Sequence, residues 1–573
     1  MSTKLPNRKI LNRPSPKISD ICDILGHISS HDKDRIAYKY FELGKLKEMT
    51  YSELYDTVCR VAAGFETIGL AGKRVAVIGD TSPQWIATYM GALASGTIIV
   101  PMDKELAIPE IEKFIESVNV EAIVYSKSFN EKFVNTIESH PTLKCFIPIV
   151  ADEEQTSDKI LPFATLLEKG KQAIENGYVI KPVENREAMC EMLFTSGTTG
   201  TSKCVMLSQK NVFSVVTSAI ETVCFVPDDV LVSVLPVHHT YELMCLVAAT
   251  VLGMTVCIND SLRHVLQNFK KFQPTGLVLV PMFLTTMYKK IWSEAERTGK
   301  SKALKFALKL SKALRCVGID LRKKLFKSVL DAFGGKLDHI ICGGAKLTPD
   351  LITAFEDFGI SVFEGFGITE CSPLVCVTPY YARKLGAIGP NVPCCDTRID
   401  PNGEKTPEGY VMGEIQVKGD NVMLGYYNNP EANADVFTED GWFRTGDVGY
   451  KDNDGYIYIT GRIKFVIVLE NGKNVFPEEI EEYLDVVDTI SECCVIGRKN
   501  ESSDEVVLTV VVYPNYTKFP ADVDDETVRD SIKKTINVIN KKLPTYKQIK
   551  AIEIRKTEFE KTTTKKIKRQ LVK

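Results

Sequence analysis

The sequence predicts an α/β protein with a large N-terminal domain, built from parallel sheets with helices plus a small β unit, and a small C-terminal α+β domain. At 573 residues the chain is longer than a single hydrophobic core usually spans, so at least two domains are expected. Helical patterns alternate with short apolar strands as far as Tyr125, which indicates parallel strands covered by helices. After Arg462, strand-like and helical patterns mix over about 110 residues, which is enough for a separate domain. We therefore expect domains at residues 1–461 and 462–573.

The first predicted elements follow one another in helix–strand order. Apolar residues recur at helical spacing over residues 52–70, and an apolar strand is expected at 74–80. The same order then repeats, with helices at 84–93 and 109–118 and strands at 96–101 and 122–125. Residues 151–187 are polar and are expected to form an irregular connector.

The segment after this connector is suited to binding phosphate. A buried strand ending at Phe194 leads into a loop rich in hydroxyl groups and glycine, whose candidate ligand-binding members are Thr195, Ser196, Gly197, Thr198, Thr199, Gly200 and Lys203. Glycines let the backbone approach an anion, N–H and hydroxyl groups donate to its oxygens, and the ammonium offsets its charge. A P-loop is excluded because Lys203 stands three residues after Gly200 and is followed by Cys204. A flexible surface loop is the remaining alternative.

The middle of the chain continues with buried segments. His238 and His239 lie between a predicted strand and an apolar helix, where histidines are usually satisfied core groups, so the pair alone is weak evidence for catalysis. The uncharged run 243–259 is shorter than the about 20 residues of a membrane span and predicts a buried helix followed by a strand. Residues 337–345 predict a strand ending in a glycine turn, which suits close approach of a flat ligand. Residues 401–460 predict a small antiparallel β unit.

Charge and cysteine content limit the possible partners and location. Lys and Arg number 71 against 74 Asp and Glu, so the formal charge of -3 provides no global field that would attract nucleic acid. Residues 300–330 are the exception, with many Lys and Arg and one acid, Asp320. A solvated helical face is the favoured interpretation of this segment, and a patch for peripheral membrane contact is the alternative. The polar N-terminus and the 16 cysteines without C-x-x-C spacing predict a cytoplasmic protein with reduced thiols.

Four further motifs follow the glycine loop in a fixed order. They are Gly365-Phe366-Gly367-Ile368-Thr369-Glu370, Gly441-Trp442-Phe443-Arg444-Thr445-Gly446-Asp447, Gly461-Arg462-Ile463-Lys464 and Gly472-Lys473-Asn474-Val475-Phe476-Pro477-Glu478-Glu479-Ile480-Glu481. Each motif alone is weak, but chance occurrence of the ordered set is improbable. The chain resembles the adenylate-forming, acyl-activating superfamily, and most closely the long-chain acyl-CoA synthetases, from about Tyr51 to Arg569.

The resemblance implies a two-step reaction with ATP, Mg²⁺ and coenzyme A. A carboxylate would attack the α-phosphorus of Mg-ATP to give an acyl-adenylate and pyrophosphate, and a thiol would then attack the activated carbonyl. A medium- or long-chain fatty acid is the favoured substrate. The alternatives are an enzyme that loads an acyl carrier protein or activates an aryl acid, and a non-catalytic regulator that binds a nucleotide or an acyl group.

The resemblance also implies roles for individual residues. The loop from Thr195 to Lys203 would hold the β- and γ-phosphates, and Glu370 would bind Mg²⁺. Asp447 would accept hydrogen bonds from the ribose and Arg462 would donate nearby. The remaining residues assigned to the nucleotide site are Gly344, Ala345, Lys346, Gly365, Phe366, Gly367, Thr369 and Lys473.

Three residues are assigned to catalysis and one to a hinge. His239 matches the family's P-x-x-H position beside the acyl and adenylate pocket, and Lys203 belongs to the phosphate loop. Lys566 would be delivered by a mobile lid to neutralise the carboxylate and the α-phosphate. Lys464 stands at the family's hinge position, so the lid is expected to swing about it. The chain departs from the family at Ser202, Cys204, Phe465 and Lys565, where Pro, Gly, an acid and Gly are usual.

Overall fold

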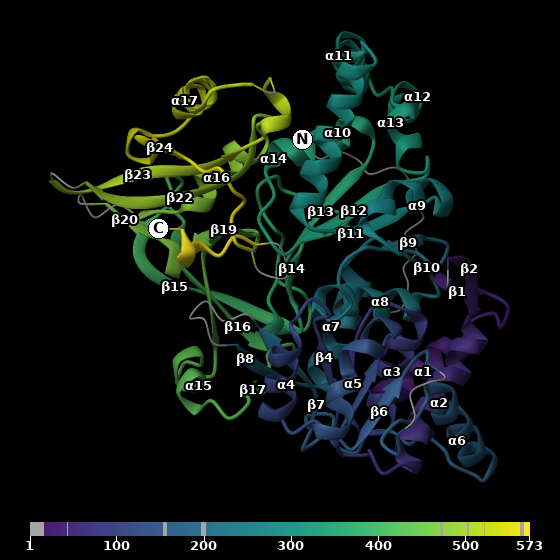
Figure 1. The fold of residues 1–573 in the computed structure, drawn as a ribbon. Coiled ribbons are helices and arrows are strands. Elements are labelled where there is room, and N and C mark those ends of the chain that lie inside the picture. Colours follow the sequence, from purple (N-terminus) through teal and green to yellow (C-terminus); the bar gives the residue numbers. More distant parts are fainter. Residues whose placement is uncertain are drawn as a thin grey trace.

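The computed structural model places a large α/β body beside a smaller C-terminal domain, as Figure 1 shows. It describes residues 16–42, 44–152, 157–195, 202–469, 474–500, 503–520, 522–561 and 566–572. The α/β class predicted from the alternating pattern is confirmed. None of the helices in these ranges is both long and apolar enough to cross a membrane.

The first sheet of the body has seven strands and carries the phosphate-loop segment. Its strands are, in spatial order, β17 (Gly425–Tyr426), β8 (Lys203–Ser208), β7 (Met189–Thr195), β4 (Ile98–Met102), β3 (Arg74–Ile78), β5 (Ala122–Tyr125) and β6 (Cys145–Pro148). Neighbours from β7 to β6 run parallel, whereas β7, β8 and β17 pair antiparallel. The candidate phosphate loop therefore joins the two strands of a hairpin, because Thr195 pairs with Lys203.

The second sheet has eight strands and carries the glycine turn. Its strands are, in spatial order, β14 (Leu374–Val377), β13 (Ser361–Gly367), β12 (His339–Gly343), β11 (Gly276–Leu279), β9 (Val230–Ser233), β10 (Thr255–Ile258), β1 (Ile36–Glu42) and β2 (Lys45–Thr50). Only the edge strands β2 and β14 pair antiparallel. Parallel strands align their carboxyl ends, so the segments that follow β12 and β13 lie together at one edge of the sheet.

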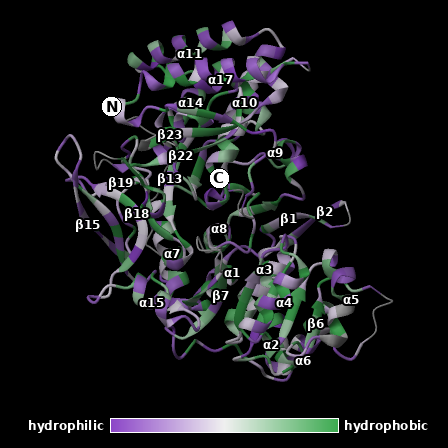
Figure 2. Cartoon of the chain, turned by 60° about the vertical axis from the view of Figure 1, so that its left-hand side comes forward, coloured by the Kyte–Doolittle hydropathy of each residue, from purple (hydrophilic) through white to green (hydrophobic). Residues whose placement is uncertain are grey.

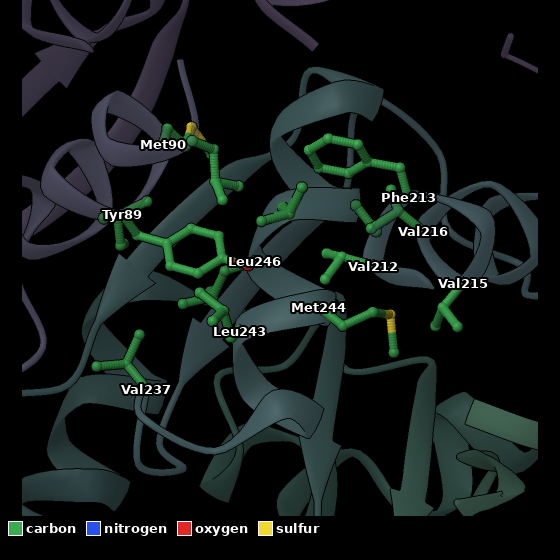
Figure 3. Packing of buried hydrophobic residues seen from close by; sticks show 14 of the residues in the cluster. Tyr89, Met90, Val212, Phe213, Val215, Val216, Val237, Leu243, Met244 and Leu246 are labelled. Atoms are coloured by element: carbon green, nitrogen blue, oxygen red, sulfur yellow. The ribbon is translucent and has the colours of Figure 1, made fainter. Parts of the chain in front are cut away.

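Helices cover both sheets. In the body they are α1 (Ile21–Ser30), α2 (Tyr51–Thr67), α3 (Pro83–Ala94), α4 (Ile108–Ser117), α5 (Asn130–Ser139), α6 (Phe163–Glu175), α7 (Gln209–Thr222), α8 (Thr240–Leu252), α9 (Val265–Phe272), α10 (Pro281–Arg297), α11 (Ser301–Cys316), α12 (Arg322–Leu325), α13 (Lys327–Ala332), α14 (Pro349–Phe358) and α15 (Pro430–Val436). Figure 3 shows the largest core, where side chains of α3, α7 and α8 such as Tyr89, Phe213 and Leu246 meet. This packing fixes α8, which begins immediately after His239.

Helix α6 corrects the expectation of an irregular connector over residues 151–187. It packs on α2 so closely that a Cβ on Gly170 would lie 1.9 Å from the carbonyl oxygen of Arg60. Only Phe163, Leu166 and Gly170 are buried in its thirteen residues. The buried face is therefore narrow, and the polar residues around it concealed the helical period when the segment was judged by its composition.

The small β unit and the C-terminal domain complete the chain. The unit is an antiparallel sheet of β15 (Cys395–Lys405), β16 (Val411–Gly419), β18 (Phe443–Lys451) and β19 (Ile457–Arg462), as predicted. The C-terminal domain contains β20 (Ile467–Val468), β21 (Asn474–Val475), α16 (Pro477–Asp485), β22 (Ile490–Asn500), β23 (Ser503–Pro514), α17 (Asp525–Asn540) and β24 (Ala551–Ile554). Ile480, Val510 and Ile532 from three of these elements share a separate core. We call this domain the lid from here on.

Candidate active site

Two glycine segments lie side by side at the carboxyl edge of the eight-stranded sheet. Gly343 pairs in register with Gly365, and Gly344 takes a φ of +85°, which favours glycine over residues with a side chain. A Cβ on Gly343 would come 3.0 Å from the carbonyl oxygen of Gly365. The absence of side chains keeps this edge flat. Ala345 follows directly in the chain, while Phe366 and Gly367 complete β13.

A carboxylate, a phenol and an ammonium meet where the two large sheets approach each other. The Tyr426 hydroxyl donates to Oε1 of Glu370 over 2.8 Å, and the Lys203 ammonium lies 4.6 Å from the centre of the Tyr426 ring. Thr369 begins the 3₁₀ turn that carries Glu370, and the backbone of that turn accepts from Met423 N–H over 2.9 Å. Burial and the Glu370 charge both raise the pKa of Tyr426, so the phenol remains a donor to the carboxylate.

Several predicted ligands of the nucleotide lie outside the described residues. These are Ser196, Gly197, Thr198, Thr199 and Gly200 in the phosphate loop, and Lys473. The two ends of the loop are described, and the Thr195 hydroxyl donates to the carbonyl oxygen of Lys203 over 3.4 Å. The hairpin therefore brings Lys203, at the described end of the loop, toward Glu370 through its contact with Tyr426.

Asp447 and Arg462 are cross-strand neighbours in β18 and β19. The Nε atom of Arg462 donates to Oδ1 of Asp447 over 2.8 Å. Burial raises the pKa of Asp447, and the opposing charges of Arg462 and Lys566 limit that rise. The charge of Asp447 in turn raises the pKa of Arg462. The pair presents a carboxylate that is only 5% exposed and already held in one orientation, which is suited to accepting hydrogen bonds from a ligand hydroxyl.

The lid brings Lys566 to this pair. Lys566 keeps contact with solvent, yet the protein around its ammonium lowers its pKa, with Arg462 adding to the effect and Asp447 opposing it. The charge of Lys566 also contributes to lowering the pKa of His239 in the body. The structure therefore brings the predicted lid lysine, Asp447, Arg462 and His239 together, although Lys566 and His239 are far apart in the sequence.

His239 is the last residue before α8, and its ring lies beside that of His238, with 4.1 Å between centroids and an angle of 49° between the ring planes. Nε2 of His238 lies 3.5 Å from Oδ2 of Asp103, which follows β4. Burial lowers the pKa of His239 to about 3, and the neighbouring His238 adds to that effect. The His239 imidazole is thus neutral near neutral pH. Its buried Nε2 atom has no hydrogen-bond partner among the described residues, so it can meet a substrate oxygen.

Polar contacts hold the lid on the body. The Lys346 ammonium lies 2.8 Å from Oε1 of Glu482 in α16. Lys289 of α10 donates to the carbonyl oxygens of Val487 and Ile490, over 3.2 and 3.4 Å. Lys346, one of the residues assigned to the nucleotide site, forms this ion pair with the lid, and its role toward a nucleotide stays a prediction. Lys464, the predicted hinge, lies in an exposed 3₁₀ turn, Ile463–Phe465, directly after β19.

An apolar cavity of about 90 Å³ opens beside the glycine edge and extends between α7, α8 and the eight-stranded sheet. Its wall includes Gly344 and Gly367 near the candidate nucleotide site, and Tyr241, Ala248 and Leu252 along α8. None of the residues around it carries a charged side chain. Tyr241 and Leu252 are eleven residues apart, which corresponds to about 16 Å of helix, so the lining of the cavity follows α8 for about three turns.

Four residues that contribute to the site or to lid docking were not predicted from the sequence: Tyr426, Asp103, Glu482 and Lys289. Tyr426 lies in a Gly- and Asn-rich segment, where an aromatic residue is not distinctive, and its role follows only from the pairing of β17 with β8. Lys289 and Glu482 are ordinary charged helix residues in sequence. Their importance comes from contacts between domains, for which neither helical period nor composition gives a signal.

The donor set suits magnesium held mainly by phosphates. Glu370 offers a hard carboxylate oxygen at the convergence of Lys203 and Tyr426. The described residues contain no cluster of three or more His, Cys, Asp or Glu side chains able to hold a metal ion alone. Mg²⁺ is commonly bound through one or two carboxylates, with substrate phosphates and water completing the shell, and this arrangement fits that pattern.

The two large sheets, the antiparallel unit and the lid define the class of adenylate-forming enzymes. The chain belongs to the family described as AMP-binding enzyme, whose pattern matches residues 27–427; the pattern of the AMP-binding enzyme C-terminal domain matches residues 464–573. The resemblance stated from the motifs is thereby confirmed.

Individual relatives are distant. A long-chain-fatty-acid–CoA ligase of Mycobacterium bovis is 27% identical over 494 residues, which cover 81% of this chain and 78% of that protein. A feruloyl-CoA synthase of Amycolatopsis sp. is 29% identical over 487 residues, covering 83% and 85%. Among solved structures, the adenylation domain of a carboxylate reductase from Mycobacterium chelonae superposes with a TM-score of 0.77 at 20% identity, covering 96% and 88%. The last likeness supports the fold alone.

Proposed function

We propose that this protein is an ATP-dependent acid:CoA ligase that activates a medium- or long-chain fatty acid. The family supports the adenylate-forming chemistry. The apolar cavity along α8, which has no charged side chain in its lining, is the observation that supports the acyl substrate. A second carboxylate or an amino group on the substrate would meet no charged partner along this wall, and burying such a group without a partner is unfavourable. An alkyl chain gains from the same surroundings because its apolar surface leaves water.

In the first step, the acid carboxylate attacks the α-phosphorus of ATP and pyrophosphate leaves. Lys566 stabilises the charge that develops between the carboxylate and the α-phosphate, since its ammonium faces Asp447, Arg462 and His239. Neutral His239 borders the carboxylate and can donate or accept one hydrogen bond without adding charge. The Asp447–Arg462 pair holds the ribose.

Lys203 and the glycine loop hold the departing phosphates in this proposal. Glu370 would hold Mg²⁺, oriented by its hydrogen bond from Tyr426. The ion, when bound, neutralises negative charge on the phosphate oxygens. The flat edge at Gly344 and Gly365 accommodates the adenine, because no side chain projects from these positions.

In the second step, the thiol of coenzyme A attacks the acyl carbonyl and AMP leaves. Lys566 is not needed for this attack, so we propose that the lid turns about Lys464 after adenylation. That movement breaks the ion pair between Lys346 and Glu482 and the bonds from Lys289 to the lid. We assign the observed lid position to the first step because it brings Lys566 to Asp447, Arg462 and His239.

The test combines purified protein and Mg-ATP with a panel of carboxylic acids that includes fatty acids of increasing length, ferulate, anthranilate and malonate. Pyrophosphate release reports adenylation, and thioester formation is then measured with coenzyme A and with an acyl carrier protein. We expect the highest kcat/KM with an apolar fatty acid and with coenzyme A. Pyrophosphate release with ferulate or a dicarboxylate alone would overturn the acyl assignment. Absence of pyrophosphate with every acid would favour a binding protein without catalysis.

A further inference from the structure

Helix α11 carries two apolar stripes, and only one of them faces the protein. Leu304, Ala307 and Leu308 pack against the core beneath α10 and α14, and Ser311 is buried on the same side. Figures 1 and 2 show the helix at the periphery of the molecule, and Figure 2 shows hydrophobic residues interrupting its strongly hydrophilic surface. The inner stripe accounts for the attachment of α11 to the body but leaves the composition of the outer side unexplained.

The outer apolar stripe follows the helical period. Phe306, Leu310, Ala313 and Val317 stand at positions i, i+4, i+7 and i+11, so they lie along one line of α11 and its C-terminal cap. Phe306 is 67% exposed and Val317 is 71% exposed. Single exposed hydrophobic residues are common on protein surfaces, but an aligned series of them indicates a surface that meets an apolar phase.

Lysines line one side of this stripe. Lys302, Lys305 and Lys309 are exposed and project from the helix next to it. Lys302 and Lys309 have no ion pair to a carboxylate among the described residues, and Lys305 lies 5.9 Å from the ring centre of Trp292. By contrast, Lys312 is paired with Asp357 over 2.9 Å. Lys302 and Lys309 are therefore not engaged in ion pairs that hold the fold together, whereas Lys305 contacts the Trp292 ring.

The local charge is opposite to that of the whole protein. The formal charge of the chain is -3, whereas residues 300–330 contain only one acid, Asp320, which Arg322 pairs over 2.7 Å. A general excess of positive charge cannot explain the segment. A helix with an apolar stripe flanked by lysine matches a membrane surface, where the stripe enters the acyl boundary and lysine meets anionic headgroups.

We propose that the outer face of α11 docks this protein on an anionic lipid membrane. Phe306, Leu310 and Val317 insert into the boundary between headgroups and acyl chains, and Lys302, Lys305 and Lys309 contact the lipid phosphates. The surface is separate from the cavity and from the candidate active site, so docking does not depend on the proposed acyl substrate. The membrane proposal replaces the interpretation of residues 300–330 as a solvated helical face, which is the one that the sequence alone favours.

The test measures co-sedimentation of the full-length protein with vesicles of phosphatidylglycerol and phosphatidylcholine and with vesicles of phosphatidylcholine alone. We expect binding to the anionic vesicles that weakens as salt rises. The triple variant Lys302→Glu, Lys305→Glu, Lys309→Glu should lower the partition coefficient at least about tenfold, since each lysine near an anionic surface contributes about fivefold. The double variant Phe306→Ser, Val317→Ser should lower it at unchanged charge.

A matched control reverses three exposed lysines on the lid helix α17 and beside it, Lys533→Glu, Lys534→Glu and Lys541→Glu. It changes net charge as much as the α11 triple variant and should leave most binding intact. Equal loss in both triples, or full binding by the serine double variant, would overturn docking through α11. Lack of vesicle binding by the unmodified protein, together with capture on immobilised polyglutamate, would assign the face to an acidic protein instead. Thermal melting and pyrophosphate release without vesicles verify that each variant is folded.

Discussion

Lys566 is the residue at which the proposed chemistry can be tested most directly. Replacing it with Ala removes the ammonium from the group formed with Asp447, Arg462 and His239. We expect pyrophosphate release to fall by about two to three orders of magnitude, the usual cost of losing one group that stabilises transition-state charge. Thioester formation from supplied acyl-adenylate should be spared. Lys568→Ala, two residues away and exposed, is the matched control. Loss of the second step alone would contradict the role given to Lys566.

The buried side chain of Glu242 should make the free energy of unfolding depend on pH. It is buried in the first turn of α8 with hydrogen bonds from the Ser233 hydroxyl and the Leu235 N–H, and burial raises its pKa from 4.5 to about 8. Between these values the folded protein retains a proton that the unfolded chain releases. Its stabilising contribution is therefore complete below pH 4.5 and is lost as the pH rises toward 8, by at most about 1.4 kcal/mol per pH unit.

The variant Glu242→Gln keeps the shape and a hydrogen-bond acceptor but cannot ionise. We expect its free energy of unfolding to decline less than that of the unmodified protein between pH 5 and pH 8, measured by urea denaturation at each pH. Glu184→Gln, at an exposed position, should follow the unmodified protein. Parallel curves for all three proteins would show that Glu242 is already ionised in the folded state.

Residue identities were predictable where several motifs reinforce one another. The ordered motifs singled out Glu370, Asp447 and Arg462, and the structure brings them together, since the charges of both carboxylates raise the pKa of Arg462. The sequence could not show that Lys346 turns toward Glu482, because that direction depends on where the lid docks. The position of Tyr426 beside Glu370 likewise depends on β17, a two-residue strand that pairs with β8 at the edge of the seven-stranded sheet.

At the scale of elements, α8 connects His239 to the apolar cavity. His239 precedes the helix, and Ala248 lines the cavity more than two turns later. We expect Ala248→Phe to shorten the space for the acyl chain. The kcat/KM for long fatty acids should fall at least about tenfold, while that for short acids changes little.

The reverse change at the distal end supplies a control. Leu252→Ala enlarges the cavity and should shift the preferred chain length upward. Thermal melting separates these effects from overpacking, which costs about 1 to 3 kcal/mol. Equal loss for short and long acids in Ala248→Phe would show that the cavity does not hold the acyl chain.

Strands and long helices were predictable because their periods are local. The helix over residues 84–93 appears as α3 (Pro83–Ala94), and the strand at 122–125 has the same bounds as β5. Helix α6 was missed because its buried face is narrow and its other sides are polar. The hairpin form of the phosphate loop could not be inferred either, since the apolar run of β8 does not reveal that it pairs antiparallel with β7.

At the scale of the whole molecule, the proposed reaction requires the lid to occupy two positions. The chain passes from β19 into the lid through the turn Ile463–Phe465. Lys464→Pro fixes one backbone angle there and removes an N–H group. We expect it to alter the ratio between the adenylation rate and the thioester rate, measured as separate half-reactions. The control is Lys464→Ala, which leaves the backbone free. A proline at Lys499 would not serve as a control, because Lys499 lies within β22. If Lys464→Pro leaves both half-reactions unchanged, the hinge lies elsewhere.

The order of the domains was predictable from length and motif order, but their docking was not. The expected boundary at residues 461 and 462 falls at the end of β19, and it stays a prediction as a unit of motion. Contacts such as that between Lys346 and Glu482 join residues far apart in sequence, and neither residue has a pattern that identifies its partner.

The covalent connection at Ile463–Phe465 makes the lid an intramolecular ligand of the body. A short tether produces an effective concentration on the order of millimolar, so a docking free energy of only about 4 kcal/mol already gives comparable docked and released populations. Polar contacts between the lid and the body, such as Lys346 with Glu482 and Lys289 with two carbonyl groups, each contribute on the order of 1 kcal/mol. A much tighter interface would leave too little of the released lid, and the acyl-adenylate would accumulate before its thiol acceptor could reach it.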